Sequence, residues 1–160
     1  MSRSRPVSAS PLDAHLGFWL RYVSNHVSGR FQTLLEAEGV TVSEWVALRT
    51  LLEQPRTHGE LIQALGMTKG ATSKVLTRLE DKGLARRELA EGRAREQVLS
   101  LTEPGLRLVP RLAKVADDNE AHFFGHLDPA QREMPLDRLI HKWILKATPA
   151  CPVRLLGWIS

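Results

Sequence analysis

The chain has 160 residues, of which 42% are hydrophobic and 25% charged, a length and composition that fit a soluble globular protein of one domain with its own core. Its net charge of +4 and its pI near 9.6 favour an anionic partner. The single cysteine, Cys151, cannot form an internal disulfide, and no apolar run has the length of a membrane span or signal peptide, so we expect a cytoplasmic protein that does not bind membranes.

Residues 1–10 are polar and lack apolar periodicity, so we expect a flexible N-terminal arm. Ser10 and Pro11 then predict a helix start, with Ser10 as the cap and proline at the first helical position. Apolar residues recur at helical spacing from there to a stop at Gly39: Leu12, Leu16, Trp19, Leu20, Val23, Val27, Phe31, Leu34 and Leu35. This face is longer than one neighbour can cover, so we expect it to pack against a second subunit.

Thr41 and Glu44 have the spacing of a capping box, in which each side chain satisfies a free backbone N–H at a helix start. Gln54-Pro55 closes the helix that this box opens. We expect the helix to be the scaffold that carries the next two.

Two short helices joined by a tight turn follow. Thr57 and Glu60 form a second capping box, and Gly66 ends the helix that they open. Thr68 starts the next helix and Gly83 stops it. This arrangement is typical of a helix-turn-helix.

The helix over residues 68–82 has an apolar side and a polar side. At helical spacing the side expected to be buried carries Ala71, Thr72, Val75, Leu76 and Leu79. The opposite side carries cations, short hydroxyl side chains and one glycine: Lys69, Gly70, Ser73, Lys74, Thr77 and, at its flank, Arg78. Such side chains reach phosphates and base edges in a DNA major groove. An ordinary solvated helix face is the alternative interpretation.

After Gly83 the pattern changes to strand, turn and strand. Arg86 lies on the incoming strand, and Arg93 and Arg95 lie at the turn. Residues 66–100 carry a net charge of +3, whereas residues 13–65 and residues 101–131 each carry −2. The excess positive charge therefore falls on the segment expected to face phosphates.

Beyond the strands, Thr102 is expected to cap a long helix with a regular apolar face: Leu106, Leu108, Val109, Leu112, Val115, Ala116 and Phe123. Pro110 lies well inside this helix and predicts a bend rather than a break. Asp128 and Pro129 open a further helix.

After Met134 the chain becomes unusual, with Pro135, a PACP sequence and the apolar ending VRLLGWIS. Two interpretations remain open at this point. The tail either clamps a dimer, since its apolar side chains would otherwise be exposed, or it replaces a native end through a shifted reading frame.

Enzyme motifs are missing from the sequence, which has no Walker-type phosphate loop and no GxSxG elbow. His122 and His126 have a spacing that can bind metal on one helix face, but Gly125 and the lack of a third ligand favour surface or interface histidines. We expect no enzyme activity, no metal and no cofactor.

Three segments, GVTVSEWVALRTLLEQP, ELIQALGMTKGATSKVLTRLEDKGLARR and EGRAREQVLSLTEPG, resemble the MarR family of winged helix-turn-helix transcriptional regulators. They follow the family's order and spacing over roughly residues 34–127. In the wing, Glu91 stands where the family usually has Asp, two residues before its Arg. The Asp–Arg bridge that supports the wing in the family is therefore expected to be made less tightly here.

The resemblance implies a mainly α fold with a small β-hairpin wing (α+β), a winged helix-turn-helix with dimerisation helices at both ends. The implied domains are an arm (1–10), an N-terminal dimerisation helix (11–40), a DNA-binding domain (41–101), C-terminal dimerisation helices (102–147) and an atypical apolar tail (148–160). The implied function is a ligand-responsive repressor that binds a pseudo-palindromic double-stranded DNA operator as a homodimer.

The expected DNA contacts are Lys69, Gly70, Ser73, Lys74, Thr77, Arg78, Arg86, Arg93 and Arg95. The family often binds small aromatic or phenolic effectors between the dimer helices and the winged domain, so Trp19, Tyr22, His26 and Trp45 are candidate pocket residues. Core packing is the alternative for each of them. The alternative function is a winged-helix adaptor that binds protein without DNA, although the cationic polar face argues against it.

Overall fold

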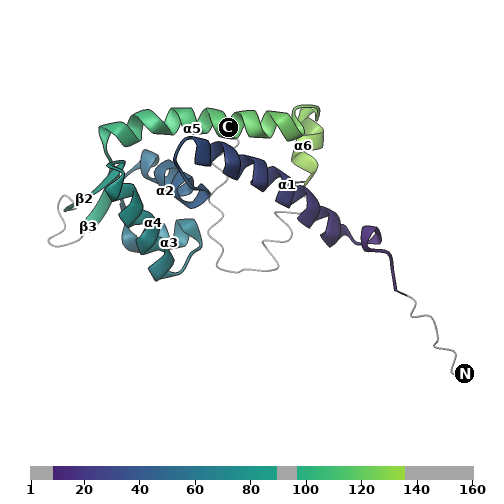
Figure 1. Cartoon of the computed structure of the whole chain (residues 1–160), viewed down its shortest axis with the longest axis horizontal. Coiled ribbons are helices and arrows are strands. Elements are labelled where there is room, and N and C mark those ends of the chain that lie inside the picture. Colours follow the sequence, from purple (N-terminus) through teal and green to yellow (C-terminus); the bar gives the residue numbers. More distant parts are fainter. Residues whose placement is uncertain (1–8, 90–96, 136–160) are drawn as a thin grey trace, which may run out of the picture.

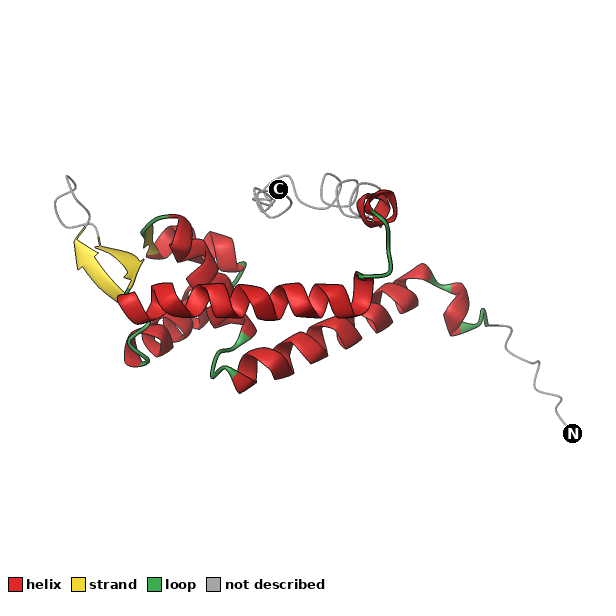
Figure 2. Cartoon of the chain, turned by 90° about the horizontal axis from the view of Figure 1, so that it is seen from above, coloured by secondary structure: helices red, strands yellow, loops and turns green. Residues whose placement is uncertain are grey.

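Two long helices lie above a small winged body in the computed structural model, which describes residues 9–89 and 97–135 (Figure 1). The long helices are α1 (Leu16–Ala37) and α5 (Glu103–Phe124), which pack against each other and run side by side (Figure 2). In the view of Figure 1 they diverge toward the N-terminal end of α1. The body contains α2 (Val42–Glu53), α3 (His58–Leu65), α4 (Lys69–Asp81) and a small sheet. A short helix, α6 (Pro129–Pro135), follows α5. The predicted fold class is thus confirmed.

The predicted helix caps in the winged body are confirmed. Thr41 with Glu44 opens α2, and Thr57 with Glu60 opens α3, each with both bonds of the capping box present. The Thr68 side chain accepts from Ala71 N at the start of α4. Local side-chain hydrogen bonds therefore set where these helices begin.

The sheet is antiparallel and has the strand order β1-β3-β2. Its hairpin consists of β2 (Ala85–Leu89) and β3 (Gln97–Leu101), as predicted. A third strand, β1 (Arg56–Thr57), was not predicted; it pairs Arg56 with Leu99 and Thr57 with Val98. Two residues that directly follow Pro55, the second of them the cap of α3, are too few to show strand periodicity, so only the pairing with β3 reveals this strand.

The predicted start of the N-terminal helix is wrong. Residues Leu12–Ala14 form a separate 3-10 turn, η1, and α1 begins only at Leu16. His15 between them is extended, with φ −99° and ψ 119°, and no side chain caps either helix. Without a bonded cap the first turn does not join the helix; instead Trp19 Nε1 donates to the Asp13 carbonyl at 2.8 Å and holds η1 against α1.

The core of the winged body is built mainly from leucines of five helices. The fully buried leucines are Leu35, Leu48, Leu61, Leu76, Leu79 and Leu112. The predicted inner face of α4 is confirmed for Thr72, Val75, Leu76 and Leu79, which are all buried, whereas Ala71 at its edge is half-buried. Burial of this face directs the polar side of α4 outward.

The start of α5 is locked against the wing. Thr102 Oγ1 donates to the Gly83 carbonyl at 2.6 Å, and Thr102 N donates to the Leu84 carbonyl at 3.1 Å. Gly105 is buried there, and a Cβ added to it would lie 2.1 Å from the Leu84 oxygen. Only glycine allows this approach of α5 to the chain entering β2. Farther along, α5 continues through Pro110 without a break, as predicted.

Polar contacts join the two long helices. Arg30 Nη1 donates to Asn119 Oδ1 at 3.0 Å, and Asn119 Nδ2 donates to the Val27 carbonyl at 3.3 Å. Arg111 pairs with Glu38 at 2.5 Å, where α1 ends. Within the part of the chain that is described, no helix has the length and apolar character needed to cross a bilayer.

Candidate nucleic-acid interface

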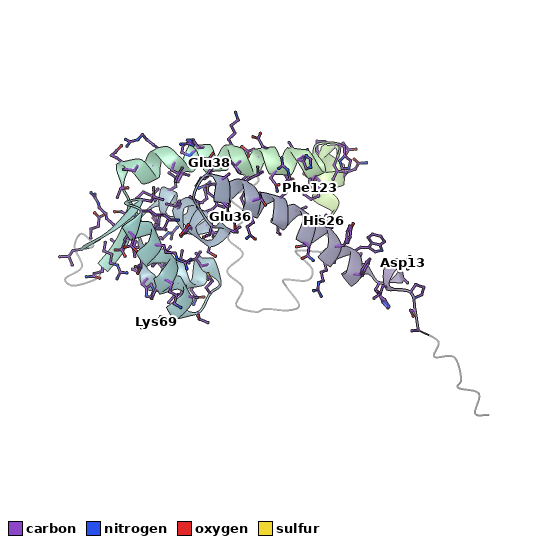
Figure 3. The ribbon with its side chains drawn as sticks, viewed as in Figure 1. Asp13, His26, Glu36, Glu38, Lys69 and Phe123 are labelled. Atoms are coloured by element: carbon purple, nitrogen blue, oxygen red, sulfur yellow. The ribbon has the colours of Figure 1, made fainter. Side chains whose placement is uncertain are left out.

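The outward face of α4 is a row of cationic and hydroxyl side chains. Lys69, Gly70, Lys74, Thr77 and Arg78 are exposed, and Ser73 is half-buried. In the view of Figure 3, Lys69 lies at the end of α4 that points away from α5. The sequence therefore predicted correctly which side of α4 faces outward.

The three cationic side chains of this face are not paired with carboxylates among the described residues. Among residues 9–89 and 97–135, Lys69, Lys74 and Arg78 make no ion pair. Their charges are exposed and available to phosphate oxygens.

The arginines of strand β2 differ from them. Arg86 Nε lies 3.2 Å from Glu88 Oε2, and Arg87 Nε lies 2.9 Å from Glu80 Oε1. Arg86 keeps 65% of its side chain exposed, so the Glu88 contact leaves much of its guanidinium accessible. Arg87 instead joins the wing to the C-terminal turn of α4. Its pairing orients the wing relative to this helix.

The wing tip carries the remaining predicted DNA contacts. The segment 90–96, which lies outside the described residues, contains Arg93 and Arg95. It also contains Glu91, which stands where the family usually has Asp. The described register, with Leu89 paired to Gln97, marks where the hairpin leads into that segment.

Among residues 9–89 and 97–135, Ser73 is the one residue of the α4 face whose side chain makes internal hydrogen bonds. Its Oγ donates to the Lys69 carbonyl at 2.9 Å and lies 3.2 Å from Nε2 of His58, the first residue of α3. Sequence reasoning missed His58. The available signal was its position directly after the cap of the first helix of a helix-turn-helix, where α3 meets α4.

Three of the four candidate effector residues lie together on α1. Tyr22 and His26 have ring centroids 4.3 Å apart, and Trp19 and Tyr22 have centroids 6.0 Å apart. Trp19 is 47% exposed and Tyr22 is 50% exposed, so the three rings form an open aromatic row. Trp45 lies elsewhere, at 3% exposure in the hydrophobic core, where it serves packing.

His122 near the end of α5 and His126, which follows that helix, show no metal-binding arrangement among the described residues. In the described segments no three His, Cys, Asp or Glu residues are grouped closely enough to hold a metal ion. His122 is exposed and its ring lies edge-on to Phe123, with centroids 4.8 Å apart.

Comparison with known proteins gives a consistent assignment. The sequence model described as "MarR family" matches residues 38–96, which cover the helix-turn-helix and the strand entering the wing. The chain is 32% identical over 123 residues to the HTH-type transcriptional repressor Rv2887 of Mycobacterium tuberculosis, covering 76% of this chain and 88% of that protein.

Solved structures share the fold at lower identity. CouR from Rhodococcus jostii RHA1, solved with p-coumaroyl-CoA bound, has a TM-score of 0.76 and 22% identity, covering 88% of this chain and 98% of CouR. MepR of S. aureus, solved in complex with DNA, has a TM-score of 0.70 and 21% identity, covering 82% of this chain and 98% of MepR. The sequence match and the helix-turn-helix geometry agree, and the chain belongs to the MarR family of transcriptional regulators.

Proposed function

We propose that this protein is a sequence-specific DNA-binding regulator that represses transcription from a pseudo-palindromic operator. The observation that carries the proposal is the outward face of α4. Its apolar residues are buried, while its three cations are exposed and make no ion pair among the described residues. An exposed cationic helix that follows a tight turn is suited to the DNA major groove. As a DNA-binding regulator, the protein would act in the cytoplasm.

Each residue of the interface has a role that its chemistry suggests. Lys69, Lys74 and Arg78 would contact phosphates, and Ser73 and Thr77 would approach base edges. Gly70 would let the helix backbone come close to the sugar-phosphate chain. Arg86, Arg93 and Arg95 would reach toward the adjacent minor groove. The repressor Rv2887 and the MepR–DNA complex support this assignment at the level of the family and the fold.

The protein would bind the operator as a homodimer. In the single chain the N-terminal half of α1 exposes a row of large apolar residues: Leu16 at 62%, Trp19 at 47%, Leu20 at 48% and Val23 at 46%. A row of this size calls for a covering partner. We assign dimerisation to residues 11–40 and 102–147, so that two α4 helices enter successive major grooves about 34 Å apart.

The aromatic row of Trp19, Tyr22 and His26 suggests a small aromatic or phenolic effector. CouR was solved with p-coumaroyl-CoA bound, and the phenolic acyl group of that ligand supports an effector with a phenolic ring. An effector that prefers a dimer with the wrong α4 spacing would release DNA by shifting the population toward that state. Trp45 has no part in this proposal because it is buried in the core.

The test is a fluorescence-anisotropy titration of the protein with the DNA upstream of its own gene at several salt concentrations. We expect a Kd of about 10 nM or lower, selectivity over unrelated duplexes and a steep decrease of affinity with salt. Weak binding that ignores sequence, by a protein whose solution mass is that of a dimer, would overturn the proposal. A monomeric mass would instead locate the defect in the dimer.

A further inference from the structure

The contact between α3 and α4 restricts one hydroxyl of the DNA-facing surface. Ser73 Oγ has two polar neighbours, the Lys69 carbonyl oxygen at 2.9 Å and His58 Nε2 at 3.2 Å. A serine hydroxyl has one proton and two lone pairs, so these two contacts use most of its capacity.

Proton accounting assigns the donors. A carbonyl oxygen cannot donate, so at 2.9 Å the Ser73 proton must point toward the Lys69 oxygen. Ser73 then has no proton left for His58, and the 3.2 Å contact is a hydrogen bond only if His58 Nε2 carries the hydrogen. His58 therefore donates to Ser73, and Ser73 donates to Lys69. One lone pair of Ser73 remains.

His58 is well placed to maintain this arrangement. It is the first residue of α3, directly after the Thr57 cap, and the Thr57–Glu60 capping box fixes its backbone. The helices that carry the two side chains contact each other, and Leu61 of α3 and Leu76 of α4 are both fully buried in the shared hydrophobic core. The imidazole is half-buried between them.

We propose that His58 is a specificity-determining positioning residue. By donating to Ser73 Oγ it keeps this side chain in the rotamer whose proton points to the Lys69 carbonyl, so that Ser73 faces DNA only as a hydrogen-bond acceptor. In the major groove an acceptor matches the amino groups of adenine (N6) and cytosine (N4). It does not match guanine O6 and N7 or thymine O4. Ser73 thus selects an adenine or cytosine at one position of each half-site. This inference rests on the proposed DNA-binding function and names what its α4 face reads.

The experiment starts from duplexes selected by the wild-type protein from a random library. The position read by Ser73 is the one where replacement by guanine or thymine lowers the affinity of the wild-type protein but not that of Ser73→Ala. At this position the selected base is replaced by its analogue without the amino group. Purine replaces adenine and 2-pyrimidinone replaces cytosine. We expect the wild-type protein to lose about tenfold in affinity for the analogue, a loss within the range of a mismatched base pair.

Three variants separate the role of His58 from a structural one. Ser73→Ala lacks the hydroxyl acceptor. It should therefore bind the duplex with the analogue and the duplex with the natural base equally well. His58→Leu, which has no donor, should lose most of the discrimination. His58→Gln, whose amide N–H can replace Nε2–H, should restore it. Thr77→Ala is the matched control on the same face and should retain the discrimination at this position. Thermal melting of each variant checks that it is folded.

The outcomes are decisive. Recovery of discrimination by His58→Gln after its loss in His58→Leu supports the proposal. Full discrimination in a folded His58→Leu variant overturns the proposal. The proposal is also overturned if His58→Leu loses affinity equally for every duplex. A wild-type protein that selects no sequence at all contradicts the proposed function itself, and a wild-type protein that selects sequence but shows no Ser73-dependent position contradicts only the role of His58.

Discussion

Lys82 Nζ lies 2.7 Å from Glu44 Oε2 and also donates to the Gly39 carbonyl at 2.8 Å. Lys82 is the C-terminal cap of α4, Glu44 lies in the first turn of α2, and Gly39 lies between α1 and α2. Glu44 is fully buried, whereas 37% of the Lys82 side chain is exposed. One ammonium group thus fastens the end of α4, the helix proposed to contact DNA, to the turn that follows the proposed dimerisation helix.

Replacing Lys82 by Met should destabilise the protein by about 3 kcal/mol, because it leaves the buried Glu44 carboxylate without its counter-charge. Urea unfolding of variant and wild type at equal protein concentration measures this loss. Lys74→Met is the matched control, since Lys74 is exposed on the same helix. A stability of Lys82→Met equal to that of the control would show that the ion pair has no net effect.

Gly105→Ala should destabilise the protein by about 2 kcal/mol, because the added methyl group overlaps the Leu84 carbonyl oxygen and one of the two backbones must move. Urea unfolding measures the effect. Gly59→Ala in α3 is the control, because a Cβ there meets only Thr57 Oγ1, at 3.9 Å. A neutral Gly105→Ala substitution would mean that α5 is not held against the start of β2 in solution.

Asn119→Ala should cost about 2 kcal/mol of stability, because it removes the acceptor of Arg30 and the donor to the Val27 carbonyl at a buried site. The neighbouring residue Asp118 is exposed, so Asp118→Ala serves as the control. Hydrogen exchange of α1 amides tests the cause. Protection of α1 should decrease in Asn119→Ala and remain unchanged in Asp118→Ala.

Lys74→Ala should weaken operator binding and reduce the slope of log K against log salt by about 1, as expected for the loss of one phosphate contact. Lys114→Ala provides the comparison, because Lys114 is exposed on α5, far in the sequence from the helix-turn-helix. Anisotropy titrations at several salt concentrations distinguish the two. Identical slopes for both variants would remove Lys74 from the interface.

Leu20→Glu should shift the protein toward the monomer, because it places a charge in the apolar row of α1 that a second copy is proposed to cover. Sedimentation equilibrium measures the association constant. Asn25→Glu is the control, since five residues along the helix place Asn25 well away from that row. If both variants associate as the wild type does, the dimer interface lies elsewhere.

The local signals of the sequence predicted most of this fold. Capping pairs such as Thr57 with Glu60 act over three residues, and the apolar period of α4 assigned its buried and exposed faces correctly. These signals succeed because the bonds they describe form within one or two helical turns. The predicted start of the N-terminal helix was wrong because the expected local bond is missing. Ser10 makes no capping bond, and the η1 turn is held by Trp19 instead.

The sequence by itself thus determined the helices, the hairpin and the exposed cationic face of α4, because each depends on neighbours in the chain. Only the tertiary structure decided the contacts between distant residues. Lys82 and Glu44 are 38 residues apart, Arg30 and Asn119 are 89 apart, and His58 and Ser73 are 15 apart. No periodicity records such pairs, because each forms only after packing of the apolar faces has brought its two helices together.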